Sequence, residues 1–202
     1  MFTGIVQAQG KVKGIEERGK AELRLTIEPV QWAKQAFILG ESIMVDGVCL
    51  TLADYHDDLL DFDVMVSTYE QTILADYTLG QMVNLEAALT LQQGLDGHLV
   101  LGHVDGKAQL EKIDIQGETH FYTFRFDNPT WGKEIVAKGS VAINGVSLTI
   151  VSTNESHFVL ALVNFTRDHT NLSQLKAGDW VNLETDILAK YVQGGLQDVG
   201  TK

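Results

Sequence analysis

Apolar and polar residues alternate with a period of two over several stretches of this sequence. Residues 23–27 of the first half and residues 121–126 of the second half follow this pattern. An alternation of this kind is typical of strands that bury one face. Clusters of Asp, Gly, Asn and Ser interrupt such stretches, as at Asp57-Asp58 and residues 153–156. The pattern predicts the hairpins of small antiparallel barrels, each with about six strands.

Three other stretches have the residue spacing of helices. Gln31 to Phe37 and Trp131 to Ala137 occupy matching places in the two halves, and we expect each to close one barrel end. The third begins after Asp186, which can cap a helix N-terminus. Its apolar side chains share one face that neither barrel requires, so we expect this face to pack against other copies of the chain. The alternative is that it covers the chain's own barrels. The face consists of Ile187, Leu188, Tyr191, Val192 and Leu196.

The second half repeats the first, offset by 98 residues, because Gly4 aligns with Gly102 without a gap in the residues that follow. Glycines and hydroxyl residues keep this register, which indicates duplication of one fold. We therefore predict a mainly β chain of two tandem, similar six-stranded antiparallel Greek-key β-barrels with short helices, followed by a C-terminal amphipathic helix. The expected divisions are residues 1–97, residues 98–185 and residues 186–202.

Composition narrows the classes of function. The chain has 202 residues, 45% of them apolar, which is enough for two compact cores. Its formal charge of -12 disfavours nucleic acid and anionic membrane surfaces as partners. It has one cysteine, no leader-like start and no apolar run of the roughly 20 residues that span a bilayer. We expect a soluble protein of the reducing cytoplasm.

Two strand-turn-strand segments, residues 42–51 and 140–149, carry the strongest chemical signal. Each contains an Asp-Gly or Asn-Gly turn followed by a strand in which alternate residues share a face. Cys49 and Thr51 therefore lie on one face, and Ser147 and Thr149 lie on the matching face of the second copy. Such pairs suit a flat heterocycle that needs several hydrogen bonds. The alternative is that they serve only strand packing, which their duplication makes less favoured.

His98 and His103 lie at the junction of the two halves. In a strand their odd spacing would send them to opposite faces, so they are poor candidates for one metal site. Each can still move a proton at neutral pH, or act as a structural hydrogen-bonding group. Cys49 has a comparable alternative as a small buried apolar residue. Its alignment with Ser147 favours a role in a pocket.

A set of motifs in this order resembles the riboflavin synthase family, alpha-chain type. The resemblance runs from Met1 to about Val192. The motifs are Met1-Phe2-Thr3-Gly4-Ile5-Val6, Gly47-Val48-Cys49-Leu50-Thr51, Gly97-His98-Leu99, Gly102-His103-Val104-Asp105-Gly106, Lys138-Gly139-Ser140, Gly145-Val146-Ser147-Leu148-Thr149, Val181-Asn182-Leu183-Glu184 and Asp186-Ile187-Leu188-Ala189-Lys190-Tyr191-Val192.

The resemblance implies an enzyme that transfers a four-carbon unit between two molecules of 6,7-dimethyl-8-ribityllumazine. The products would be riboflavin and 5-amino-6-ribitylaminouracil, and no cofactor or metal would be needed. Each barrel would bind one lumazine, with the active site formed between the N-terminal barrel of one subunit and the C-terminal barrel of another in a homotrimer. Lumazine synthase is a possible further partner. Holding two substrates face to face can contribute several kcal/mol toward the barrier.

The resemblance also implies the site residues. The candidates for catalysis are Cys49, His98, His103, Ser147 and Thr149, and it does not rank them as base or nucleophile. The expected ligand contacts of the first barrel are Gly4, Ile5, Val6, Cys49, Leu50, Thr51 and the strand of Asp63, Val64, Met65, Val66, Ser67 and Thr68. Those of the second barrel are Gly102, His103, Val104, Ser147, Leu148, Thr149, Ala161, Leu162, Val163, Asn164, Phe165 and Thr166, with Lys138 reaching a ligand of a neighbouring subunit.

Several positions depart from the family pattern, and they gather around the expected pockets. Ser67 removes an expected carboxylate, and the other departures are Asp96, Leu101, Asn144, Asn164 and Phe165. They leave open a non-catalytic lumazine or flavin binder of the lumazine-protein type. Both Gly-x-Cys/Ser-Leu-Thr motifs are nevertheless present, which favours the enzyme. A structural module without a ligand is disfavoured, because core packing alone would not keep the polar pairs in register.

Overall fold

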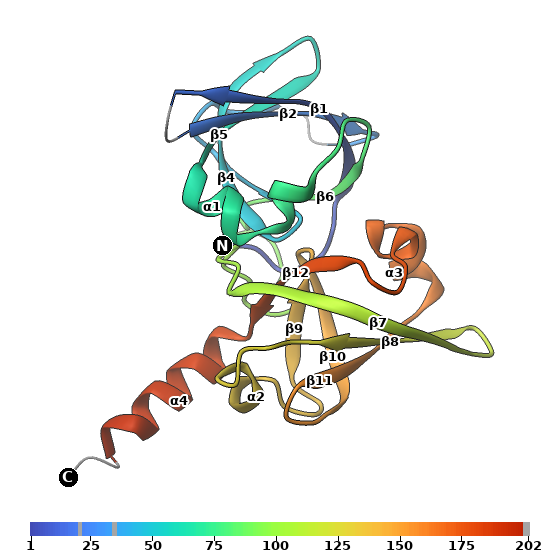
Figure 1. Cartoon of the computed structure of the whole chain (residues 1–202). Helices are drawn as coiled ribbons and strands as arrows, with labels where there is room; N and C mark the ends of the chain where they lie inside the picture. The colour runs from blue at the N-terminus through green and yellow to red at the C-terminus, as the bar shows by residue number, and fades with distance from the viewer. Residues whose placement is uncertain (20–21, 34–35, 200–202) are drawn as a thin grey trace.

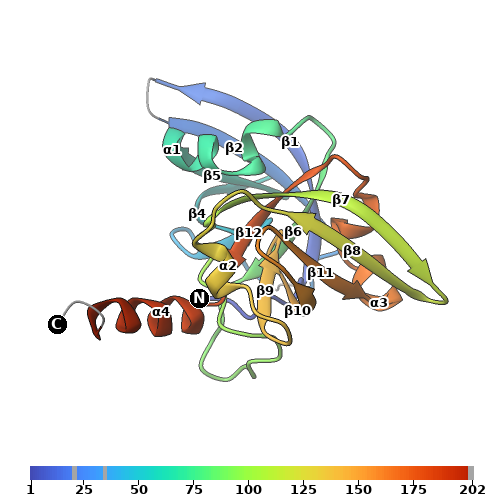
Figure 2. The ribbon, with the colours of Figure 1, turned by 60° about the horizontal axis from the view of Figure 1, so that its bottom comes forward.

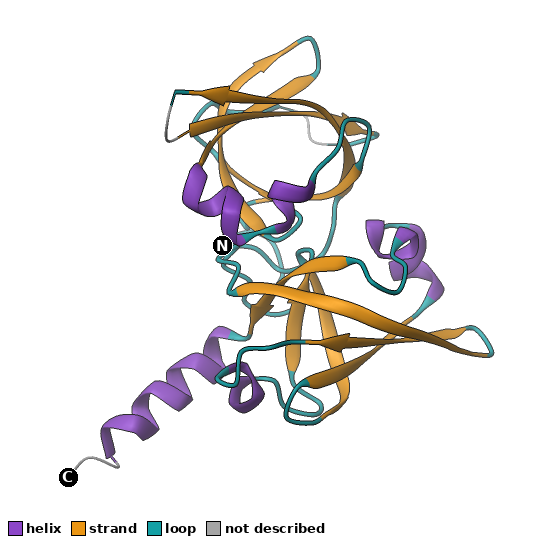
Figure 3. Cartoon of the chain, in the orientation of Figure 1, coloured by secondary structure: helices purple, strands orange, loops and turns teal. Residues whose placement is uncertain are grey.

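The computed structural model describes residues 1–19, 22–33 and 36–199, which form two closed antiparallel barrels (Figures 1 and 3). The strands of the first barrel follow the order β1-β2-β5-β4-β3-β6, and those of the second repeat it as β7-β8-β11-β10-β9-β12. The prediction of two six-stranded barrels is confirmed. The first barrel has β1 (Ala8–Arg18), β2 (Glu22–Val30), β3 (Ser42–Val45), β4 (Val48–His56), β5 (Leu59–Met65) and β6 (Met82–Ala87). The second has β7 (Gly106–Gln116), β8 (Thr119–Arg125), β9 (Ser140–Ile143), β10 (Val146–Thr153), β11 (His157–Leu162) and β12 (Trp180–Thr185).

Each barrel carries a short helix and a 3-10 turn between its fifth and sixth strands, α1 (Val66–Gln71) with η1 (Ile73–Asp76) and α3 (Asn164–Asp168) with η2 (Asn171–Gln174). The expected strand from Asp63 to Thr68 is therefore wrong beyond Met65, and in the second barrel the equivalent strand ends at Leu162. The chain folds back at this point because a threonine links the two turns. The Thr72 hydroxyl donates to the Thr68 carbonyl at 2.8 Å and accepts from the Leu74 amide at 3.3 Å.

The two expected barrel-end helices are shorter than predicted or absent. In the second barrel α2 (Trp131–Glu134) ends early, because Ile135 is already extended. In the first barrel the described residues of the 31–37 segment form no helix. Gln31 has a φ of 51°, in the left-handed region, which starts the segment away from helical geometry. The packing role survives, since Trp131 is buried in the second core and Trp32 packs against the first.

The predicted alternation places one face of each strand in a separate barrel core. On β2, Leu23, Leu25 and Ile27 are all buried, and on β8 Tyr122 and Phe124 face inward. A third, smaller apolar cluster of Phe2, Met44, Val100 and Ala142 lies between the barrels. The barrels are therefore in contact through packed side chains as well as through the connecting chain.

The Asp46-Gly47 and Asn144-Gly145 turns meet back to back between the barrels. All four residues have positive φ, as such two-residue hairpin turns require. A Cβ at Gly47 would lie 2.9 Å from the Gly145 amide nitrogen, so the turns touch through their backbones. Asn171 links the second half to the first, because its Nδ2 donates to Asp46 Oδ1 at 2.9 Å and its backbone amide donates to Asn84 Oδ1 at 2.8 Å.

The helix α4 (Ile187–Val199) projects away from both barrels (Figures 1 and 2). The Asp186 side chain caps it by accepting from the Leu188 amide at 2.9 Å, as predicted. Leu188, Tyr191, Val192 and Leu196 are each at least 60% exposed, so this face does not cover the chain's own barrels. Within the described residues, no helix is both long enough and apolar enough to cross a membrane.

Candidate functional site

The segment that precedes each barrel crosses over to the other barrel. The Ser147 amide donates to the Gly4 carbonyl at 2.8 Å, and the Cys49 amide donates to the Gly102 carbonyl at 2.9 Å. The expected grouping of residues 4–6 with the first site and residues 102–104 with the second is therefore wrong. The repeat aligned these segments correctly, but it carries no information on which barrel each one contacts.

Close packing fixes both crossings. Gly4 and Gly102 each have a φ of +77°, and a Cβ on either would lie 2.6 Å from the Cβ of Ser147 or Cys49. Only glycine permits this backbone conformation and this approach at the same time. The residues that follow also reach the opposite core, since Val6 packs against the second core and Val104 against the first.

Two buried carboxylates hold the crossing segments in place. Glu86 on β6 accepts from the amides of Thr3 and Gly4 at 2.7 and 3.0 Å. Glu184, its repeat equivalent on β12, accepts from the Leu101, Gly102 and His103 amides at 2.7, 2.9 and 3.0 Å. Burial raises the pKa of Glu184 to about 7, although the donated N–H groups and nearby Lys190 act in the opposite direction. Burial also raises the pKa of Glu86.

The crossing segment covers a cavity of about 190 Å³ on the first barrel. Cys49 is half-buried there and Thr51 is exposed, while Leu50 points into the core, as the alternation predicts. The wall thus offers a thiol, hydroxyls, an amide and an imidazole to a ligand. The lining residues are Val48, Cys49, Thr68, Gln71, Thr72, Gly102, His103 and Val104.

The matching surface of the second barrel brings His98 and Ser147 together. His98 Nδ1 lies 2.7 Å from Ser147 Oγ, and His98 Nε2 is buried without a hydrogen-bond partner among the described residues. Burial lowers the pKa of His98, although Asp186 acts to raise it. Gly97 makes the approach possible, because a Cβ there would lie 2.9 Å from the Cβ of Ser147.

His98 and His103 therefore belong to separate sites, although their segment is not the strand we expected. It is irregular apart from one bridge between Val100 and Phe2. Metal coordination by both histidines does not fit this arrangement, since His98 meets Ser147 and His103 lines the cavity at Cys49.

Only part of the expected contact set faces the sites. The side chains of Leu50, Val64, Leu148 and Leu162 are buried in the barrel cores, so only their backbone groups are available to a ligand. The remaining expected contacts are at least partly accessible: Ile5, Asp63, Met65, Val66, Ser67, Lys138, Thr149, Ala161, Val163, Asn164, Phe165 and Thr166.

Other residues of the site were missed by the motif comparison. Gln71 and Thr72 line the first cavity, and Glu86 and Glu184 position the crossing segments. Asn84-Leu85-Glu86 and Asn182-Leu183-Glu184 were visible as repeated motifs. A glutamate at the same place in both repeated motifs indicated that its carboxylate has a specific partner, which in the structure is the backbone amides of the crossing segment.

Larger cavities lie elsewhere. One of about 410 Å³ lies between the barrels beside Asn144, Asn171 and Trp180. Another of about 540 Å³ lies at the end of the first barrel beside Trp32 and Tyr55. The smaller cavity at Cys49 fits the repeated polar pairs better, because a related surface exists at the same place on the second barrel.

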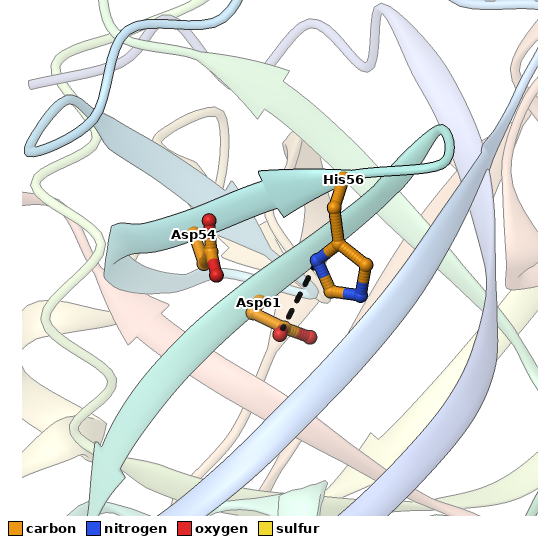
Figure 4. A group of neighbouring side chains, drawn as sticks. All are labelled: Asp54, His56 and Asp61. Atoms are coloured by element: carbon orange, nitrogen blue, oxygen red, sulfur yellow. Dashed lines mark ion pairs between the residues drawn. The ribbon is translucent and has the colours of Figure 1, made fainter.

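Asp54, His56 and Asp61 form a group on β4 and β5 whose ligand atoms lie within 4.8 Å of one another (Figure 4). Asp61 is already engaged, since it accepts from Thr26 Oγ1 at 2.6 Å and lies 3.2 Å from Arg24 Nη1. The guanidinium beside Asp61 supplies the positive charge that a metal ion would bring. The arrangement is that of a surface ion-pair network.

Comparisons with known proteins agree with the duplicated fold. The family model described as Lumazine binding domain matches residues 3–88 and residues 101–186. The riboflavin synthase of Bacillus subtilis is 37% identical over 192 residues, covering 95% of this chain and 88% of the relative. That of Mycobacterium tuberculosis (strain ATCC 25618 / H37Rv) is 37% identical over 206 residues, covering 99% and 100%.

A solved structure of LumP complexed with riboflavin has a TM-score of 0.82 and 25% identity, covering 92% of this chain and 99% of that one. The same fold is seen in LumP complexed with 6,7-dimethyl-8-(1'-D-ribityl) lumazine, at a TM-score of 0.81. The chain therefore belongs to the lumazine binding domain family, among the riboflavin synthases.

Proposed function

We propose that this protein converts two molecules of 6,7-dimethyl-8-ribityllumazine into riboflavin and 5-amino-6-ribitylaminouracil. The observation that carries the proposal is the pair of matched sites, one at Cys49 and one at Ser147, each completed by a segment from the other half. A reaction between two identical molecules needs two related sites. Binding both substrates replaces a bimolecular encounter with an effectively intramolecular one.

The chemistry requires a proton to leave the 7-methyl group of one lumazine and a nucleophile to add at C7 of the other. His98 suits the proton transfer, because its lowered pKa keeps the imidazole neutral at neutral pH. Ser147 Oγ at 2.7 Å orients that ring or carries the proton onward. Cys49, His103 and Thr149 are the further candidates for addition, for water positioning or for proton transfer.

We also propose that the active unit is a homotrimer in which the first site of one subunit faces the second site of another. The exposed apolar face of α4 supports self-association. In that arrangement Lys138, which is exposed, would reach a ligand of the neighbouring subunit. The single cysteine, which can form no intrachain disulfide, is consistent with a location in the reducing cytoplasm. Lumazine synthase is the further partner to test.

A lumazine or flavin binder without turnover is the second candidate. The departures Ser67, Asn164 and Phe165 near the two sites favour it, as does the similarity to the LumP structures. The proposed enzyme keeps the advantage because His98, Ser147 and the first cavity are all in place.

Incubation of the purified chain with 6,7-dimethyl-8-ribityllumazine separates the two candidates. If the chain is the enzyme, the absorbance of the lumazine falls while that of a flavin rises, whereas a binder without turnover retains the lumazine unchanged. The Ser147→Ala variant should lose about tenfold in rate, the equivalent of one hydrogen bond to His98, while the first site still binds. The Ser173→Ala variant, which changes an exposed serine on η2 whose hydroxyl donates to the Thr170 carbonyl, is the control. An unchanged rate in Ser147→Ala would remove Ser147 from the mechanism.

A further inference from the structure

Apart from His98, which lies beside Ser147 in the second site, the two sites differ in the segment that supplies a histidine. In the first site His103 comes from the crossing segment, and Gln71 comes from the end of α1. The repeat places Ile5 at the position of His103 and His169 at the position of Gln71. The second site therefore has an apolar residue on its crossing segment and a histidine on its helix wall.

The backbone around His169 matches that around Gln71 closely enough to place both side chains alike. The Thr170 hydroxyl donates to the Thr166 carbonyl at 2.7 Å, as the Thr72 hydroxyl does to Thr68. Thr170 Oγ1 also accepts from the Leu172 amide at 3.3 Å, the same length as the equivalent bond in the first half. Since Gln71 lines the first cavity, the equivalent position lies on the second site.

The His169 ring is held in one orientation by Phe165. Nδ1 lies 2.8 Å from the Phe165 carbonyl oxygen, so it carries the hydrogen and donates. The Phe165 ring stacks on the imidazole with centroids 4.1 Å apart and an interplanar angle of 21°. In the neutral ring this tautomer leaves Nε2 as an acceptor.

His169 also lacks a carboxylate partner of the kind that two other histidines of this chain have. His56 and His157 face Asp61 and Glu111 at 3.9 and 3.0 Å. In the part of the chain that the structure describes, no carboxylate lies within ion-pair distance of His169, whose side chain is exposed. An oriented acceptor without a protein donor is available to a ligand.

We propose that His169 binds the ligand of the second site, with Nε2 accepting a hydrogen bond from a ring N–H or a ribityl hydroxyl group. This inference rests on the proposed lumazine or flavin binding, but it does not require turnover. His169 is a ligand-binding residue that orients the heterocycle in the second site, where Ile5 supplies no polar group. In the first site His103 lines the cavity from the crossing segment.

Riboflavin binding to the full chain tests this assignment, because riboflavin does not react. Cys49→Trp is introduced to fill the first cavity, so that only the second site binds. In this background His169→Asn keeps an amide near Nδ1 but has nothing at the Nε2 position, whereas His169→Gln reaches that position. Loss of one hydrogen bond should weaken binding by about two- to tenfold in His169→Asn. His169→Gln should restore affinity to near that of the Cys49→Trp background.

Equal affinity of the His169→Asn variant and its background would overturn the proposal. His157→Gln, which changes a surface imidazole of β11, is the control for altered charge and should leave binding unchanged. If Cys49→Trp unfolds in a melting experiment, the comparison is made without it. His169→Asn should then weaken one of two binding steps and leave the other intact, and an unchanged isotherm is the contrary result. Two-site binding without turnover would refute the enzyme and leave this assignment standing.

Discussion

Substitution of Gly102 by alanine is the sharpest test of the crossing segments. The change acts in two ways, since Gly102 has a φ of +77° and a new Cβ would lie 2.6 Å from the Cys49 Cβ. A left-handed backbone costs a non-glycine residue roughly 1–2 kcal/mol. Overpacking at a closed contact costs about 1–3 kcal/mol more. The variant should lose the sum of both in free energy of unfolding.

Gly80→Ala separates these two contributions. Gly80 has a φ of +86°, and no atom lies within 4 Å of a Cβ built there. It should lose only the backbone contribution. The measurement is urea unfolding followed by the fluorescence of the three tryptophans. Gly102→Ala should be less stable than Gly80→Ala by about 1–3 kcal/mol.

The same pair of variants reports on function. Gly102→Ala should push the segment away from Cys49 and break the 2.9 Å bond from the Cys49 amide, so the first site loses affinity for riboflavin. Gly4→Ala should affect the second site in the same way, through Ser147. Equal stability of Gly102→Ala and Gly80→Ala, with riboflavin binding intact, would refute the close packing of residue 102 on Cys49.

Two further predictions concern pH and assembly. Burial raises the pKa of Asp46 to about 7, so the native state binds the proton of the Asp46 carboxyl group more tightly than the unfolded state does. This proton stabilises the fold fully below about pH 4, and the stabilisation is lost as the pH rises through 7. The wild type should therefore lose on the order of 4 kcal/mol more than Asp46→Asn between pH 4 and pH 8, and parallel urea-unfolding profiles would contradict this origin. Replacing Tyr191 and Val192 by serine should lower the mass measured in solution, because both are exposed on α4; the control changes exposed Lys133 to serine, and an unaltered mass would show that this face is not the contact.

Much of the fold could be predicted because it depends on local signals. The Asp-Gly and Asn-Gly turns predicted two hairpins, and the alternation of apolar and polar residues in β2 and β8 identified the buried faces. The cap at Asp186 marked the start of α4 correctly. The helix expected from Gln31 did not form in the described residues, because Gln31 has a φ of 51°, in the left-handed region, and helical spacing in the sequence does not reveal this geometry.

The site was harder to predict because its parts come from distant segments. Cys49 and Ser147 were identified from their repeat, but the pairing of Cys49 with Gly102 depends on the path of the chain between the barrels. Gln71 and His169 carry no motif, since each is defined only by its place at the C-terminal end of a short helix. Their contribution follows from tertiary contacts that a linear pattern does not contain.

The exchange of covering segments has a consequence for the ancestry of the chain. A single barrel with this geometry would have no crossing segment over its own binding surface, so it would need a second copy with which to exchange crossing segments. In the duplicated chain both crossing segments belong to one molecule and can differ in sequence, as Ile5 and His103 do. Cleavage of the chain near residue 97 would therefore leave each binding surface without its crossing segment, unless the two fragments associate.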